Sequence, residues 1–125
     1  MTGDATPALL ATTIDCVDLD GMTRFWSMLL DVEAEIHEPF GFLRPSEGRK
    51  ATIWLQRVPE ERVGKNRLHL DFVVRDLGGA CQRVVDLGGS LGSESSWESF
   101  HWRTCLDPEG NEFDIMQAQE PPPEA

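Results

Sequence analysis

A chain of 125 residues has room for one domain and can bury roughly two-thirds of its unfolded surface without disulfides or metals. Its net charge of −11 argues against binding to nucleic acids and to anionic membrane surfaces, because both select for basic patches. No apolar run approaches membrane-spanning length and the N-terminus lacks a signal-peptide pattern, which predicts a cytoplasmic location.

Hydrophobic periodicity predicts the elements in chain order, between flexible termini at residues 1–8 and 118–125. Apolar residues at helical spacing predict helices over 20–30 and 77–88. Short runs of strand-forming residues, bounded by polar or glycine-containing turns, predict the remaining elements as strands. The predicted strands cover residues 11–17, 33–38, 40–45, 51–58, 67–74, 90–96, 101–106 and 112–118.

One layout occurs twice in the chain, at an offset of 58 residues. A strand-like run leads into Asp18-Leu19 and a predicted helix, and a second run leads into Asp76-Leu77 and another helix. The same offset aligns residues 51–58 with 109–116, and the polar segment 59–64 separates the halves. A strand–helix–strands arrangement used twice predicts paired positions around a shared site.

Alternation along the strands predicts that polar side chains gather on one face of the sheet. In strands 51–58, 67–74 and 112–118, one alternate set of residues is apolar and suits packing against a helix. The other set lies on the face away from the helices, here called the open face. A sheet with one apolar face and one such mixed face predicts a cavity for a small molecule. The predicted open-face residues are Trp54, Gln56, His69, Asp71, Val73, Glu112 and Asp114.

Tryptophans and basic residues add to this prediction. Trp54 lies beside Gln56 on the open face, while Trp97 falls in a polar segment, 94–100, that predicts a loop at the cavity mouth. Trp102 is a further candidate wall residue. Seven of the eleven basic residues lie between positions 44 and 67, where they would either attract an anionic ligand or form a solvated rim, the commoner outcome.

The three cysteines favour a structural role. Cys16, Cys81 and Cys105 are widely spaced, with no Cys-x-x-Cys pair, and the first two fall on positions predicted to face the core. This pattern favours reduced, buried thiols over a disulfide, a zinc site or a nucleophile.

Several segments together carry a family resemblance. They are 65–71 (Lys-Asn-Arg-Leu-His-Leu-Asp), 87–89 (Leu-Gly-Gly) and 107–113 (Asp-Pro-Glu-Gly-Asn-Glu-Phe). They resemble the vicinal oxygen chelate superfamily, which groups glyoxalases, bleomycin-resistance proteins and extradiol dioxygenases, and look closest to its short glyoxalase-like branch. The resemblance covers residues 9–117 and implies an α+β fold. Two βαβββ modules, about 9–59 and 66–117, would form a curled mixed sheet, a cup usually completed in a homodimer.

The resemblance also implies a candidate metal site. Metal-binding members place one ligand on the first and one on the last strand of each module, which corresponds here to Ala11, Gln56, His69 and Asp114. The 58-residue offset gives the same pairs, 11 with 69 and 56 with 114. Imidazole and carboxylate bind first-row divalent metals well, an amide oxygen binds weakly and alanine does not bind. The resemblance therefore allows two cases. One divalent metal binds at His69, Gln56 and Asp114, or the site holds no metal.

Two functions fit this resemblance. A lyase or isomerase would use His69 and Asp114, with or without metal, to move a proton next to a carbonyl. A non-catalytic protein of the bleomycin-resistance type would sequester its ligand, and this function does not need a metal ligand at Ala11. Alternatively, His69 only satisfies buried partners such as Gln56 or Asp114. Ligand contacts are predicted from Trp54, Gln56, Asp71, Trp97 and Trp102.

Overall fold

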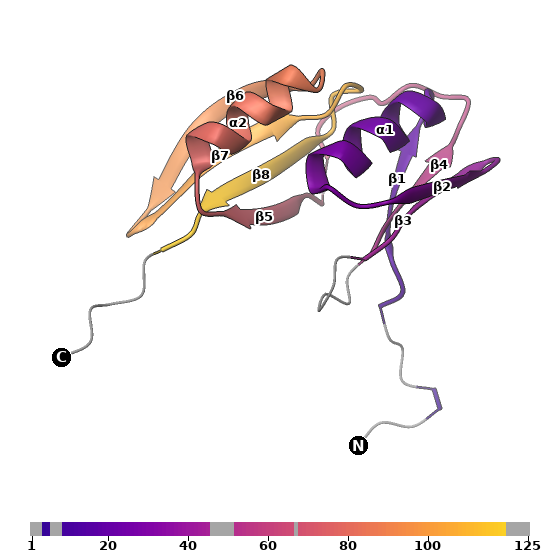
Figure 1. Cartoon of the computed structure of the whole chain (residues 1–125), viewed down its shortest axis with the longest axis horizontal. Helices are drawn as coiled ribbons and strands as arrows, with labels where there is room; N and C mark the ends of the chain where they lie inside the picture. The colour runs from indigo at the N-terminus through magenta and orange to yellow at the C-terminus, as the bar shows by residue number, and fades with distance from the viewer. Residues whose placement is uncertain (1–3, 6–8, 46–51, 67, 120–125) are drawn as a thin grey trace. The chain divides into compact units, whose positions relative to one another are not determined.

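Each half of the chain folds as a strand, a helix and three further strands (Figure 1). The computed structural model describes residues 4–5, 9–45, 52–66 and 68–119. The chain divides into two compact units, Met1–Glu60 and Glu61–Ala125, so the boundary falls inside the polar segment predicted to separate the halves. Within the described part of the chain, no helix is both long and apolar enough to cross a membrane.

The predicted elements are confirmed to within a few residues at their ends. Unit 1 contains β1 (Thr12–Cys16), α1 (Leu19–Leu30), β2 (Ala34–His37), β3 (Phe40–Leu43) and β4 (Ile53–Arg57). Unit 2 contains β5 (Leu70–Val74), α2 (Leu77–Asp86), β6 (Ser90–Trp97), β7 (Phe100–Leu106) and β8 (Glu112–Gln117). The expected mouth loop over 94–100 is wrong, because this segment is the end of β6 and the start of β7. The predicted starts at residues 51 and 67 lie outside the described residues.

Both sheets are mixed and have the same topology. The strand order is β1-β4-β3-β2 in unit 1 and β5-β8-β7-β6 in unit 2. In each sheet the first and last strands of the unit pair in parallel, and the remaining pairs are antiparallel. The α+β class with two βαβββ modules is therefore confirmed. The closure of both sheets into one cup stays a prediction.

The repeated Asp-Leu pairs mark the starts of the two helices. Asp18 and Asp76 are N-caps, whose carboxylates accept hydrogen bonds from the backbone N–H of Gly21 (3.1 Å) and Gly79 (3.0 Å). Glycine suits both donor positions, because a Cβ there would collide with the capping carboxylate. The repetition in the sequence therefore preserves a helix start rather than a site.

The apolar faces of the sheets are covered by the helices. In unit 1 the buried side chains of α1 include Phe25 and Trp26, and in unit 2 those of α2 are Cys81 and Val84. All three cysteines are buried thiols outside any disulfide, and burial raises the pKa of the Cys105 thiol to about 12. Their burial outside any disulfide confirms the prediction of reduced, buried thiols, and Cys105 in particular is a poor nucleophile because its thiol stays protonated at neutral pH.

One close approach between helix and sheet requires a glycine. The Thr23 side chain on α1 is buried, and its Oγ1 has no hydrogen-bond partner in the described structure. Gly41 on β3 faces this hydroxyl, and a Cβ at Gly41 would collide with Thr23 Oγ1. The helix therefore lies against the strand only because position 41 has no side chain.

We predict that Gly41→Ala lowers the free energy of unfolding by about 1–3 kcal/mol, because the added methyl overpacks this contact. In a Thr23→Ala background the same change is expected to cost much less, since the colliding hydroxyl is gone. Urea denaturation of the four proteins of this cycle measures the coupling. Equal costs in both backgrounds would contradict the account.

Candidate functional site

The open face of unit 2 carries the candidate site, which is built by the register of three strands. Parallel pairing of β5 with β8 places Asp71 opposite Asp114, and antiparallel pairing of β7 with β8 places Thr104 opposite the same residue. The residues flanking Asp114, Phe113 and Ile115, are buried on the helix side. Asp114 consequently points to the open face, where alternation predicts it.

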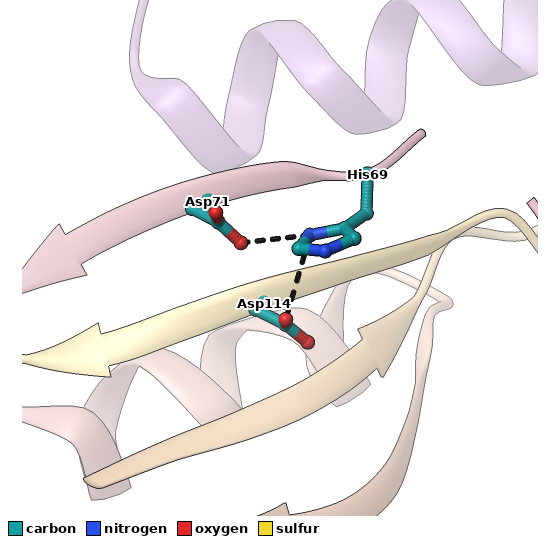
Figure 2. A group of neighbouring side chains, drawn as sticks. All are labelled: His69, Asp71 and Asp114. Atoms are coloured by element: carbon teal, nitrogen blue, oxygen red, sulfur yellow. Dashed lines mark hydrogen bonds and ion pairs between the residues drawn. The ribbon is translucent and has the colours of Figure 1, made fainter. Parts of the chain in front are cut away.

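His69 lies directly before β5 and turns its ring toward both carboxylates (Figure 2). Its Nδ1 is 2.8 Å from Asp71 Oδ1 and 3.5 Å from Asp114 Oδ2. Thr104 Oγ1 donates a hydrogen bond of 2.7 Å to the other oxygen of Asp114. The side chains of His69 and Asp71 are 52% and 61% exposed and that of Asp114 is 20% exposed, so a solute can reach the group.

The carboxylates determine which ring nitrogen of His69 carries the proton. An ionised carboxylate only accepts hydrogen bonds, so Nδ1 must be the donor to Asp71. In the neutral ring, Nε2 then has a free lone pair, and among the described residues it has no hydrogen-bond partner. An acceptor nitrogen oriented through its neighbour by a carboxylate is an arrangement suited to proton abstraction.

A tight turn between β7 and β8 supports this register. Asp107 is 3% exposed, and its Oδ1 accepts hydrogen bonds from the backbone N–H of Glu109 and Asn111 at 3.0 and 2.9 Å. Its Oδ2 accepts a third hydrogen bond from the Asn111 side chain at 2.8 Å. Gly110 has a φ of 86°, which glycine adopts without strain. This turn leads directly into the strand that carries Asp114.

The corresponding position in unit 1 is Trp54, not Gln56. Thr13 opposes Trp54 as Asp71 opposes Asp114, and Thr13 and Asp71 are equivalent at the predicted offset of 58. The last strands are therefore related by 60 residues, and the predicted pairing of Gln56 with Asp114 is wrong by two positions. The physical reason is the path length: counted from the helix starts at Leu19 and Leu77, the chain takes two more residues to reach the equivalent position of the last strand in unit 2.

Unit 1 has an aromatic open face where unit 2 has an acidic one. The rings of Phe42 and Trp54 meet edge to face at 5.1 Å, and Phe40 stacks on Phe42 at 5.7 Å. The alternate residues of β3, Gly41 and Leu43, are buried toward α1. Sequence reasoning missed Phe40 and Phe42, although alternation along the predicted strand 40–45 would have placed both on the open face.

The remaining predicted residues have mixed outcomes. Trp102 is half-buried on the open face opposite Met116, whereas Trp97 is 64% exposed and stacks on Phe100 at 6.1 Å. Glu112, predicted on the open face, is 27% exposed as a side chain and lies 3.9 Å from Arg62. Trp54 and Gln56 belong to unit 1, so their convergence with His69 stays a prediction.

The described basic residues favour a solvated rim over an anion site. Arg57 pairs with Glu38, and its hydrogen bond lowers the pKa of that carboxyl. Arg44 donates to Glu35 at 2.9 Å and, ahead of a further bond from His37, lowers the pKa of Glu35. These guanidinium groups are already neutralised by neighbouring acids. Three other residues of the basic segment, Arg49, Lys50 and Arg67, lie outside the described residues.

Comparison with known proteins identifies the fold family. A family model described as a glyoxalase-like domain matches residues 11–116. A glyoxalase/bleomycin resistance protein/dioxygenase family enzyme from Burkholderia phytofirmans is similar in structure, with a TM-score of 0.73, 18% identity, and 88% of this chain and 98% of that chain covered. No curated protein sequence matches the chain.

Two fosfomycin resistance proteins are also similar in structure. FosX from Mesorhizobium loti gives a TM-score of 0.71 at 17% identity, covering 91% of this chain and 94% of that chain. An E126Q mutant of FosX from Listeria monocytogenes, complexed with Mn(II) and 1S,2S-dihydroxypropylphosphonic acid, gives 0.74 at 15% identity, covering 91% and 92%. Identities this low support a shared fold and do not transfer an activity.

The geometry predicts opposite tautomers for two of the three histidines. Neutral His69 should carry its proton on Nδ1, because Asp71 accepts there, whereas neutral His37 should carry it on Nε2, which faces Glu35 at 3.3 Å. Nitrogen-15 NMR of the imidazole rings reports both states, with exposed His101 as the reference. Asp71→Ala should lower the Nδ1–H fraction of His69 alone. An Nε2–H ring at His69 in the unmodified protein would contradict the site geometry.

Proposed function

The chain belongs to the glyoxalase-like domain family, and from this premise we propose that it binds a small oxygen-bearing organic molecule on the open face of unit 2. We further propose that His69 moves a proton next to a carbonyl of that molecule, so that the protein acts as a lyase or isomerase. The observation that carries the proposal is the 2.8 Å contact between His69 Nδ1 and Asp71 in an accessible position.

The residues divide the work of a proton transfer. Nε2 of His69 takes the proton from carbon, and the imidazolium that forms is stabilised by Asp71 on its Nδ1 side. Asp114 adds a second negative charge at 3.5 Å, and Thr104 holds its carboxylate in place. The same imidazolium then returns the proton. Delivery to the neighbouring carbon completes an isomerisation, and delivery to an oxygen that leaves that carbon as its C–O bond breaks completes an elimination.

The same three side chains fit a divalent metal ion, the cofactor that the family resemblance implies. His69, Asp71 and Asp114 each offer one ligand atom, and these atoms lie within 4.8 Å of one another. Metal bonds of about 2.1 Å at 90–110° separate neighbouring ligand atoms by roughly 3.0–3.4 Å, close to the observed 2.8 and 3.5 Å. These residues would hold the ion with the ring proton of His69 moved from Nδ1 to Nε2, so metal binding is an alternative to proton abstraction by Nε2. The ion would then supply polarisation of a bound carbonyl. Gln56 belongs to unit 1, so its expected role as a further metal ligand stays a prediction.

A second candidate function is ligand sequestration without chemistry. The observation that favours it is the aromatic face of unit 1, where Phe42 and Trp54 form an edge-to-face pair at the position equivalent to the acidic site. Aromatic faces bind planar or cationic groups without needing a base. Retained ligand affinity with no proton transfer would select this function.

We also propose that the protein is a cytoplasmic homodimer. In each unit the first strand is an edge of its sheet, and an unpaired edge is a surface that proteins usually cover. Buried thiols outside any disulfide are consistent with a reducing compartment.

The catalytic proposal predicts that the protein accelerates deuterium exchange at the hydroxymethyl carbon of hydroxyacetone, because removal of that proton forms an enediol. His69→Ala should slow the exchange by about 100-fold or more. Proton NMR in deuterated buffer follows the reaction. His101→Ala is the matched control and should retain the rate, since His101 is exposed on β7. If His69→Ala instead destabilised the fold and left exchange unchanged, the structural role of His69 would be the correct one.

The metal fit predicts that the protein binds Mn²⁺, measured as loss of the free-ion electron paramagnetic resonance signal. Thr104→Val should weaken binding by about 10–100-fold, because it removes the donor that orients Asp114. Asp86→Asn on α2 serves as the control, since it removes a carboxylate outside the site. Absence of Mn²⁺ binding at millimolar concentration would rule out this site.

The dimer proposal predicts a sedimentation mass of two chains of 14.0 kDa at micromolar concentration. Dissociation should follow dilution, because assembly depends on protomer concentration. A mass of one chain at the highest concentration would contradict the proposal.

A further inference from the structure

Beside the polar group on the open face of unit 2 lies a row of apolar side chains. The register across β7, β8 and β5 gives one row of Thr104, Asp114 and Asp71. Two residues further along β5 and β8, the same register gives a second row of Trp102, Met116 and Val73. Within each row, the three residues lie on neighbouring strands. The two rows share one face of the sheet, because on each strand the residue of the second row is two positions from the residue of the first.

The apolar row is accessible and not part of the core. Val73 is 54% exposed, while Met116 and Trp102 are half-buried. Core contacts are made instead by the alternate residues, such as Ile115 at 3% exposure. Burying such apolar surface is worth about 25 cal/mol per Å², so the row favours an apolar occupant.

The polar group has a different neighbour in the opposite direction. There Glu112 faces Arg62 at 3.9 Å, and the Glu112 carbonyl accepts a hydrogen bond from Asn66. Leu106 lies opposite Glu112 on that side, but the ion pair and the hydrogen bond at Glu112 make the side less favourable for an apolar substituent than the wholly apolar row. A ligand whose oxygens lie at His69 is therefore directed toward Val73 and Met116.

We propose that the ligand of this site is an aryl compound whose ring is bonded directly to the oxygen-bearing carbons. This inference rests on the proposed function, because it takes the oxygens to lie at His69, Asp71 and Asp114. The two rows are roughly 7 Å apart, since a strand rises about 3.3–3.4 Å per residue. An aryl ring attached to a carbonyl extends over about this distance and places its face on Met116, a favourable thioether contact.

The test compares two probes that share the same oxygens, 2-hydroxyacetophenone and hydroxyacetone. The phenyl probe should bind about tenfold tighter or more, since it buries several additional carbon atoms. Val73→Thr, which keeps the shape but replaces a methyl by a hydroxyl, should weaken only the phenyl probe, by about fourfold. Val85→Thr is the matched control, because Val85 is 44% exposed on α2. Ligand-detected NMR titration gives the affinities.

The outcomes separate this inference from the function on which it rests. Equal affinities for the two probes, with no effect of Val73→Thr, would overturn the aryl assignment. If His69→Ala still weakened the binding of both probes, the proposed site would stand. A change in sedimentation mass of Val73→Thr without a change in probe affinity would show that protein covers the row, which also overturns it. Failure of 2-hydroxyacetophenone to bind at millimolar concentration would also overturn the aryl assignment. The proposed proton transfer would still be tested by deuterium exchange of hydroxyacetone.

Discussion

The parallel pairing of β5 with β8 is the constraint on which the candidate site depends. It places Asp71 beside Asp114 on the face away from α2, and the pairing of β7 with β8 then adds Thr104 to the same group. Two carboxylates side by side repel each other, and the Nδ1–H of His69 lies where it can interact favourably with both. A shift of one residue would turn Asp114 into the apolar layer occupied by Phe113 and Ile115.

The two units share their helix caps and strand order but differ in the side chains of their open faces. Asp18 and Asp76 cap equivalent helices, and both sheets have the same strand order. On the open faces, however, Trp54 occupies the position equivalent to Asp114. Helix capping and core packing depend on the local fold, so they are retained in both units. Open-face side chains do not pack against the helix of their own unit, which leaves them free to differ.

Much of the fold could be predicted from the sequence because its signals are local. Helical spacing located α1 and α2, and alternation assigned His69, Asp71 and Asp114 to one face. The resemblance to the glyoxalase-like family supplied the module order that local signals do not give. Alternation also identified Trp54 as an open-face residue, although not as the counterpart of Asp114.

The errors arose where pairing between strands decides the outcome. The segment 94–100 is polar and resembles a loop, yet it forms the hairpin of β6 and β7 because its backbone pairs with a neighbouring strand. The offset of 60 between the last strands depends on loop lengths, which a periodic pattern cannot reveal. The contact of His69 with Asp71 was accessible from their spacing, whereas the bond from Thr104 to Asp114 required the register of β7.

The central claim is that the open face of unit 2, around His69, is where this protein meets its ligand. The most direct measurement is NMR chemical-shift mapping of the isotope-labelled protein during titration with 2-hydroxyacetophenone. The account predicts that the largest shifts within unit 2 fall on His69, Asp71, Asp114 and Met116. Shifts concentrated instead on α2, on the opposite side of the same sheet, would contradict it.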